Sequence, residues 1–170
     1  MASLMEELLD VLGKEEKQYQ ELITLATEKT DAVVQGNIEH LTDVTTREQD
    51  AASVLLNLSN KRNRVLTDMA TVLGQSPEEM TITKMIGYLN KQPKEQEALT
   101  RQRDRLLEAG AKMQQLNRQN EALLKQALEM VEFDLTLLKS MRQAPETANY
   151  NKNAYNTGDL LGGSGFDAKQ

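Results

Sequence analysis

Side chains that could carry acid–base or nucleophilic chemistry are sparse in this sequence of 170 residues. It contains no cysteine, so a thiol nucleophile, a zinc ribbon and a disulfide framework are all excluded. The single histidine is His40, and neither a serine elbow nor a second histidine accompanies it. Nucleophilic and general-base catalysis need such partners within hydrogen-bonding reach. We interpret His40 as a surface residue and expect the protein not to be an enzyme.

The sequence also lacks a recognisable motif for phosphate, metal or cofactor binding. No GxxxxGK[ST] run is present. The glycine-rich run at 162–165 follows no expected strand and opens no expected helix, which is typical of a flexible spacer. The acidic pairs are adjacent in sequence, and their expected role is solubility and helix-start electrostatics. We therefore expect neither a cofactor nor a metal site. These acidic pairs are Glu6/Glu7, Glu15/Glu16 and Glu78/Glu79.

The formal net charge of −6 argues against nucleic acid or an anionic membrane as the partner, because both favour basic surfaces. The basic runs at 61–64 and 101–105 are interpreted as solvated helix faces. Acidic residues interrupt the opening MASLMEELLD, which is unlike a secretory signal, and no window has the apolar length of a membrane span. We expect a cytoplasmic protein without membrane insertion.

Composition and periodicity predict an all-α fold. Aromatic residues make up 4% and charged residues 27%, a balance that suits long helices better than sheets. Apolar residues recur at steps of three and four over 4–35 and again over 38–73. Gly36 is the expected end of the first helix, Asn37 the N-cap of the second, and Gly74 its end. Such a short connection predicts an antiparallel hairpin.

A short helix and one long helix are expected after the hairpin. Residues 76–79 (SPEE) have the pattern of a capping box with proline at the first helical position. The apolar spacing that follows predicts a short helix over about 82–90, covering one end of the hairpin. A last helix is expected from about Lys94 to Arg142, with Gly110 weakening it locally. The result is a long helical hairpin or three-helix, coiled-coil-like bundle with one short intervening helix.

The second half of this last helix carries more apolar surface than one neighbour would cover. Placed at about 100° per residue, its apolar positions span an arc of about 180°. Either this segment lies between two helices, or part of it is left for another molecule. Met130 and Met141 on this arc fit core packing and an adaptable binding surface equally well. The arc comprises Leu123, Leu124, Ala127, Leu128, Met130, Val131, Leu135, Leu137, Leu138 and Met141.

The amphipathic pattern stops after residue 143, which divides the chain into a helical domain (1–143) and an Asn- and Gly-rich tail (144–170). We predict that the tail is disordered in isolation. It nevertheless holds Tyr150, Tyr155 and Phe166, half of the six aromatic residues. Low complexity with embedded aromatic anchors is typical of a segment that folds on binding.

Four segments resemble the family of flagellar export chaperones called FlgN. They are the opening LMEELLDVL (4–12), the central stretch at 73–89, the late-helix run NRQNEALLKQALEMVEF (117–133), and a tail with Tyr155 and Gly158. The resemblance covers about residues 4–160. It implies long antiparallel helices with a short intervening helix. It also implies a cytoplasmic chaperone that binds terminal helical segments of the hook–filament junction proteins FlgK and FlgL, prevents their early assembly, and passes them to the type III export apparatus.

In this family the binding region lies toward the C-terminus, which here corresponds to the late helix and the tail. Apolar positions at helical spacing can form the groove that an amphipathic segment needs. The alternative hypothesis is a structural or adaptor coiled coil that homodimerises through the same apolar face, and the oligomeric state is left open. The expected partner-binding residues are Leu124, Leu128, Val131, Leu135, Leu138, Tyr150 and Tyr155.

Overall fold

The computed structural model describes the backbone of residues 1–167 and the side chains of residues 1–143. Its elements are the helices α1 (Ala2–Gln35) and α2 (Ile38–Val72), the short 3₁₀ helix η1 (Pro77–Glu79), and the helices α3 (Ile82–Tyr88) and α4 (Pro93–Asp167). The predicted all-α fold is confirmed. The chain forms two compact units, Met1–Leu124 and Lys125–Gln170.

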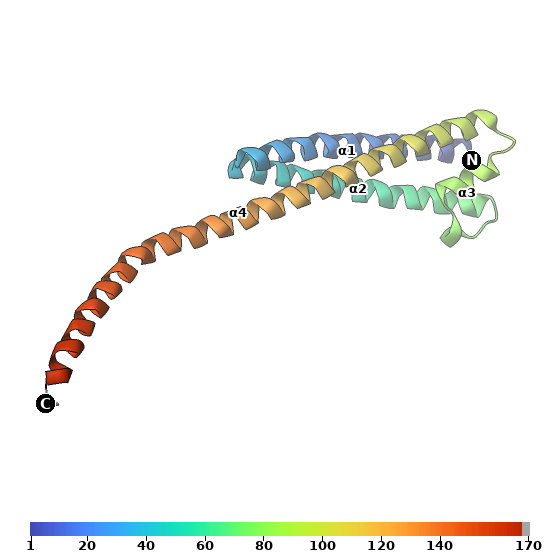
Figure 1. Ribbon diagram of the computed structural model, residues 1–170. Coiled ribbons are helices and arrows are strands. Elements are labelled where there is room, and N and C mark those ends of the chain that lie inside the picture. The colour runs from blue at the N-terminus through green and yellow to red at the C-terminus, as the bar shows by residue number, and fades with distance from the viewer. Residues whose placement is uncertain (168–170) are drawn as a thin grey trace. The chain divides into compact units, whose positions relative to one another are not determined.

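Helices α1 and α2 form the predicted antiparallel hairpin (Figure 1). Gly36 ends α1 in the left-handed conformation, with φ of 65°, and the backbone N–H of Asn37 donates to the carbonyl of Ala32 at 3.0 Å. The side chain of Asn37 then accepts from the backbone N–H of His40 at 3.0 Å and caps α2. The helix end and the cap predicted from the sequence are both confirmed.

Ion pairs along the hairpin show its antiparallel register. Near the turn Lys29 pairs with Glu48 at 2.8 Å, and further away Glu15 pairs with Arg62 at 3.0 Å. Residues progressively earlier in α1 therefore pair with residues progressively later in α2, as expected of antiparallel helices. Gly74, with φ of 63°, follows the end of α2 as predicted.

The connection after α2 corrects one prediction. Ser76 makes no side-chain capping bond, so the capping box expected at 76–79 is wrong. Residues 77–79 form a single 3₁₀ turn, closed by the Met80 N–H donating to the Pro77 carbonyl at 3.3 Å, which does not open an α-helix. The functional cap is Thr81, whose hydroxyl oxygen accepts from the Lys84 backbone N–H at 3.1 Å. Helix α3 ends at Tyr88, slightly before the predicted end.

The main hydrophobic core lies at the end of the hairpin away from Gly36, and we call it the closed end. It joins the start of α1, the end of α2, Met80, α3 and the start of α4. The interpretation of the short helix as a cover for one end of the hairpin is therefore confirmed. The fully or nearly fully buried members are Met5, Leu8, Leu12, Val65, Leu66, Met69, Ala70, Met80, Met85, Leu89 and Leu99.

The part of α4 that belongs to the first unit runs parallel to α1 (Figure 1). Gln102 donates to Glu16 at 2.6 Å, and Asn120 donates to the Ala26 carbonyl at 2.8 Å, so both position numbers rise together. The helix is unbroken at Gly110. The first unit is thus a three-helix bundle of α1, α2 and the early part of α4.

The backbone of α4 extends to Asp167, beyond the end near Arg142 that the loss of amphipathic period predicted. A hydrophobic period reports a buried face rather than the backbone conformation itself, so its loss is a weak signal for a helix end. The tail predicted at 144–170 has its side chains outside the described residues, and the domain division at 143 stays a prediction. Among the described residues, no helix is both long and apolar enough to cross a membrane.

Candidate functional site

The late part of α4 exposes a dense group of large apolar side chains. Leu128 is 64% exposed and Phe133 is 67% exposed. Six further apolar residues in the range 130–141 are exposed to a similar extent. A helix forms here because residues 111–144 contain neither glycine nor proline and are rich in Leu, Glu, Lys and Gln. The exposed members are Leu128, Met130, Val131, Phe133, Leu135, Leu137, Leu138 and Met141, and we call them the α4 apolar face.

Elsewhere in the described residues, exposed large apolar side chains are scattered. Val72 and Leu107, for example, have no other exposed large apolar residue within ten positions of them, and isolated cases need no explanation. Eight such residues within fourteen positions are different, since contiguous apolar surface of this kind marks an interaction site.

The structure brings together four of the seven predicted binding residues. Leu128, Val131, Leu135 and Leu138 are all exposed and follow one another at steps of three and four, so they share one side of α4. Leu124 is only half-buried and belongs to the first unit. The side chains of Tyr150 and Tyr155 lie outside the described residues. Phe133 was missed, because it lies at the far edge of the arc and has only Met130 and Leu137 beside it.

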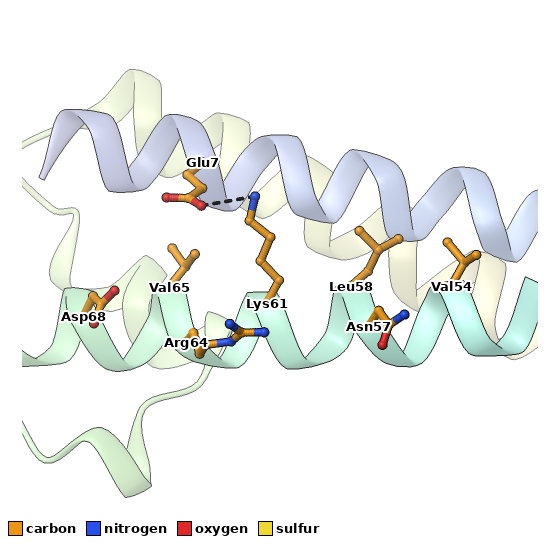
Figure 2. Close-up of a pocket in the computed structure, with 8 residues that line it drawn as sticks. All are labelled: Glu7, Val54, Asn57, Leu58, Lys61, Arg64, Val65 and Asp68. Atoms are coloured by element: carbon orange, nitrogen blue, oxygen red, sulfur yellow. Dashed lines mark ion pairs between the residues drawn. The ribbon is translucent and has the colours of Figure 1, made fainter.

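A hollow lies between α1 and α2 on the surface of the hairpin (Figure 2). Val54, Leu58 and Val65 of α2 form its apolar floor, and Lys61 pairs there with Glu7 of α1 at 3.2 Å. Arg64 and Asp68 also line it, so charges of both signs surround the floor. This mixed, partly paired lining does not select a ligand of one charge.

Two charged residues have roles that the sequence interpretation did not give them. Glu15 was assigned to solubility, yet it is 1% exposed and accepts from Arg62 at 3.0 Å. Arg62 was assigned to a solvated face, yet it links α2 to this buried carboxylate on α1 and also donates to the hydroxyl of Ser59 on its own helix. Desolvation raises the pKa of Glu15, and the Arg62 charge opposes that rise. The pair is structural, and only the register of the hairpin could have revealed it.

Asn120 is the second buried polar residue that sequence reasoning missed. Its amide nitrogen donates to the Ala26 carbonyl, and its amide oxygen accepts from the Thr30 hydroxyl at 2.5 Å. Both the nitrogen and the oxygen of its side-chain amide are therefore hydrogen-bonded to α1. A buried polar side chain bonded in this way fixes the register of one helix on another.

No catalytic or metal-binding arrangement is found within the described part of the chain. His40, which was interpreted as a surface residue, is half-buried at the start of α2. Groups of three or more His, Asp or Glu side chains that could hold a metal ion are absent from the residues described. The α4 apolar face thus stands as the candidate functional site.

Comparison with known proteins gives one clear result. The model of the FlgN protein family matches residues 1–158, which is most of the chain. No curated protein and no solved structure matches.

Proposed function

Because the chain belongs to the FlgN family, the cytoplasmic flagellar export chaperones for FlgK and FlgL, we propose that it holds these partners on the α4 apolar face. The family function is non-enzymatic: its members bind FlgK and FlgL and deliver them to the export apparatus. The proposal concerns where on this chain the partners bind and which side chains hold them.

The exposed position of the α4 apolar face is the observation that supports this site. An unassembled junction segment that forms an amphipathic helix needs a complementary surface with apolar positions at helical spacing. Leu128, Val131, Leu135 and Leu138 offer that spacing, and each is exposed in the chain without its partner. Burying a large apolar side chain from full exposure contributes about 1.5–3 kcal/mol, so these four partly exposed anchors supply several kcal/mol against the cost of association. Leu124, four positions before Leu128, continues the same spacing in the sequence.

The test replaces two anchors with charged residues in the full-length chain. Leu128→Asp with Leu135→Asp should abolish binding of the terminal segments of FlgK and FlgL in a calorimetric titration, because each lost anchor costs about 1–4 kcal/mol. Circular dichroism should remain close to that of the unchanged protein, since both positions are exposed. Normal binding by this double variant would place the site elsewhere.

A matched control adds the same two charges to the polar side of the same helix. Thr136→Asp with Gln143→Asp changes exposed residues outside the apolar face and should leave the affinity within about twofold. Loss of binding in the control would mean that added negative charge, rather than lost apolar contact, explains the result.

Tyr150 and Tyr155 are proposed to cover the bound segment from the C-terminal side. Replacing both with alanine in the full-length chain should weaken binding by about tenfold or more, because tyrosines are frequent interface anchors. Unchanged affinity would exclude the two tyrosines from the site.

The second candidate is a structural coiled coil, and one observation favours it. The row from Leu124 to Leu138 has steps of four, three, four and three, which is the heptad spacing of a dimer seam. A dimer at low micromolar concentration in a solution mass measurement, together with no binding to FlgK or FlgL segments, would support this reading. A monomer that binds those segments one to one would exclude it.

A further inference from the structure

The α4 apolar face consists of two stripes. The first stripe is Leu128, Val131, Leu135 and Leu138, which lie within about 80° of one another at about 100° per residue. The second stripe is Met130, Phe133, Leu137 and Met141, which occupies a neighbouring arc of about 80°. One packed helix covers only a narrow a/d seam, so it would leave one stripe in water. The exposed face is therefore wide enough for two helices.

Helix α1 shows how this chain covers an arc of that width. Its buried positions, from Met5 to Ala32, span about 180°, and both α2 and α4 pack on them. A carboxylate, Glu15, lies near the middle of this arc and is almost completely buried. It is accommodated because Arg62 of one of the two covering helices donates to it at 3.0 Å.

Asp134 has the same position on the late part of α4 that Glu15 has on α1. Placed at about 100° per residue, it lies between Leu138 of the first stripe and Met141 of the second. It is exposed in the chain without a partner. One helix on either stripe would leave its carboxylate at the edge of the contact and in water. Two helices would enclose it, and an enclosed carboxylate needs a cationic group from one of them.

The charge within the face argues that these helices come from another protein. Placed at about 100° per residue, Glu129 and Glu132 lie on the opposite side of α4, and Asp134 is the charged residue between the two stripes. In a parallel in-register pair of copies, each Asp134 would meet the Asp134 of the other copy. In an antiparallel pair centred on the face, near position 134, the two Asp134 carboxylates would again lie close together. Like charges at an interface are unfavourable, so this position selects a partner that is basic at its centre.

We propose that a cargo segment binds the late part of α4 as two helices, one on each stripe, with a basic side chain of the cargo placed on Asp134. This inference rests on the proposed function, because it specifies the form in which the same face takes its cargo. The bound state would then be a three-helix arrangement like that of α1, α2 and the early part of α4. Asp134 would act as a specificity residue, since a cargo lacking the basic group would leave the carboxylate enclosed and unpaired.

The first experiment compares the two stripes in the full-length chain. Calorimetric titrations with the terminal segments of FlgK and FlgL would use Leu128→Asp with Leu135→Asp for the first stripe. They would use Phe133→Asp with Leu137→Asp for the second stripe, and Thr136→Asp with Gln143→Asp as the control. Each stripe variant should weaken binding by at least about tenfold, while the control stays within about twofold.

Three outcomes distinguish the inference from the proposed function. Loss of binding in both stripe variants supports two helices. Loss in the first-stripe variant alone overturns the two-helix inference and leaves a single-helix groove. Normal binding in the first-stripe variant overturns the proposed site itself.

The second experiment tests the charge on Asp134 and does not depend on apolar packing. Asp134→Lys places a cation opposite the cargo's basic group and should weaken binding by about tenfold or more, with unchanged helicity. A cargo segment whose central basic residue is replaced by glutamate should recover the affinity with this variant. Binding of Asp134→Lys within about twofold of the unchanged protein would show that this carboxylate remains in water, which overturns the inference.

Discussion

The closed end of the bundle and the α4 apolar face are built from the same residue types and end in opposite environments. Met69 and Met85 at the closed end are fully buried, whereas Met130 and Met141 on the α4 face are mostly exposed. The closed end is covered by four segments of the same chain, from α1, α2, α3 and the early part of α4. The difference teaches that apolar content and helical period identify a contact surface but do not say which molecule covers it.

The largest effect that separates the two regions is on stability. Leu99→Ala removes a side chain that is fully buried among α1, α2 and α3 residues and should lower the free energy of unfolding by about 2–5 kcal/mol. Leu128→Ala removes the same atoms from an exposed position and should change it by less than about 0.5 kcal/mol. Urea denaturation of both variants measures the contrast. A similar destabilisation by the two substitutions would mean that the α4 face is covered by the chain itself.

A smaller effect is expected where polar atoms hold α4 on α1. Asn120→Ala removes the donor to the Ala26 carbonyl and the acceptor for the Thr30 hydroxyl, and should cost about 1–3 kcal/mol. Amide hydrogen exchange should rise in α4 near residue 120 while the closed end stays protected, because Asn120 does not belong to the closed-end core. If Asn120→Ala reduces amide protection equally at the closed end, the first unit unfolds as a single cooperative unit.

The smallest effect concerns Glu15, and it depends on pH. Its pKa in the folded protein is raised above the ordinary value of 4.5 by burial, with Arg62 opposing the rise. Between these two values the folded protein keeps a proton that the unfolded chain releases, so this group's contribution to stability falls as pH rises. Glu15→Gln has no such group and can still accept from Arg62. The difference in unfolding free energy should therefore shift in favour of Glu15→Gln from about pH 4 upward, then level off, by less than about 2 kcal/mol.

Denaturant unfolding of Glu15→Gln and the unchanged protein at matched pH values measures this difference, and the other carboxylates cancel in it. A difference that stays constant with pH would contradict the raised pKa. A difference that moves against Glu15→Gln with rising pH would show that Arg62 outweighs the burial.

Local signals in the sequence were enough for the hairpin. Gly36 and Asn37 predicted where α1 ends and α2 begins, because a left-handed glycine and an asparagine cap act within a few residues of their own position. Residues 76–79 show the limit of the same reasoning. The capping-box pattern was present, yet the chain makes a 3₁₀ turn there and starts the helix from Thr81.

The candidate site was predicted in part. Leu128, Val131, Leu135 and Leu138 were found from spacing alone, since a shared helix face follows directly from steps of three and four. Whether that face was buried between two helices or left open could not be read from spacing. The exposure of the side chains decided in favour of an open face. Phe133 was missed for the related reason that it lies at the edge of the arc.

The sequence by itself determined the helical class, the hairpin turn and the position of the apolar face, because each depends on local conformation and on periodicity along one helix. The tertiary structure decided which charged and polar residues are buried. Glu15 meets Arg62, and Asn120 meets Ala26 and Thr30, only through the register between helices distant in sequence. Among the described residues it also decided that the closed end is buried by other segments of the chain while the α4 apolar face is exposed, since coverage depends on which segments pack together.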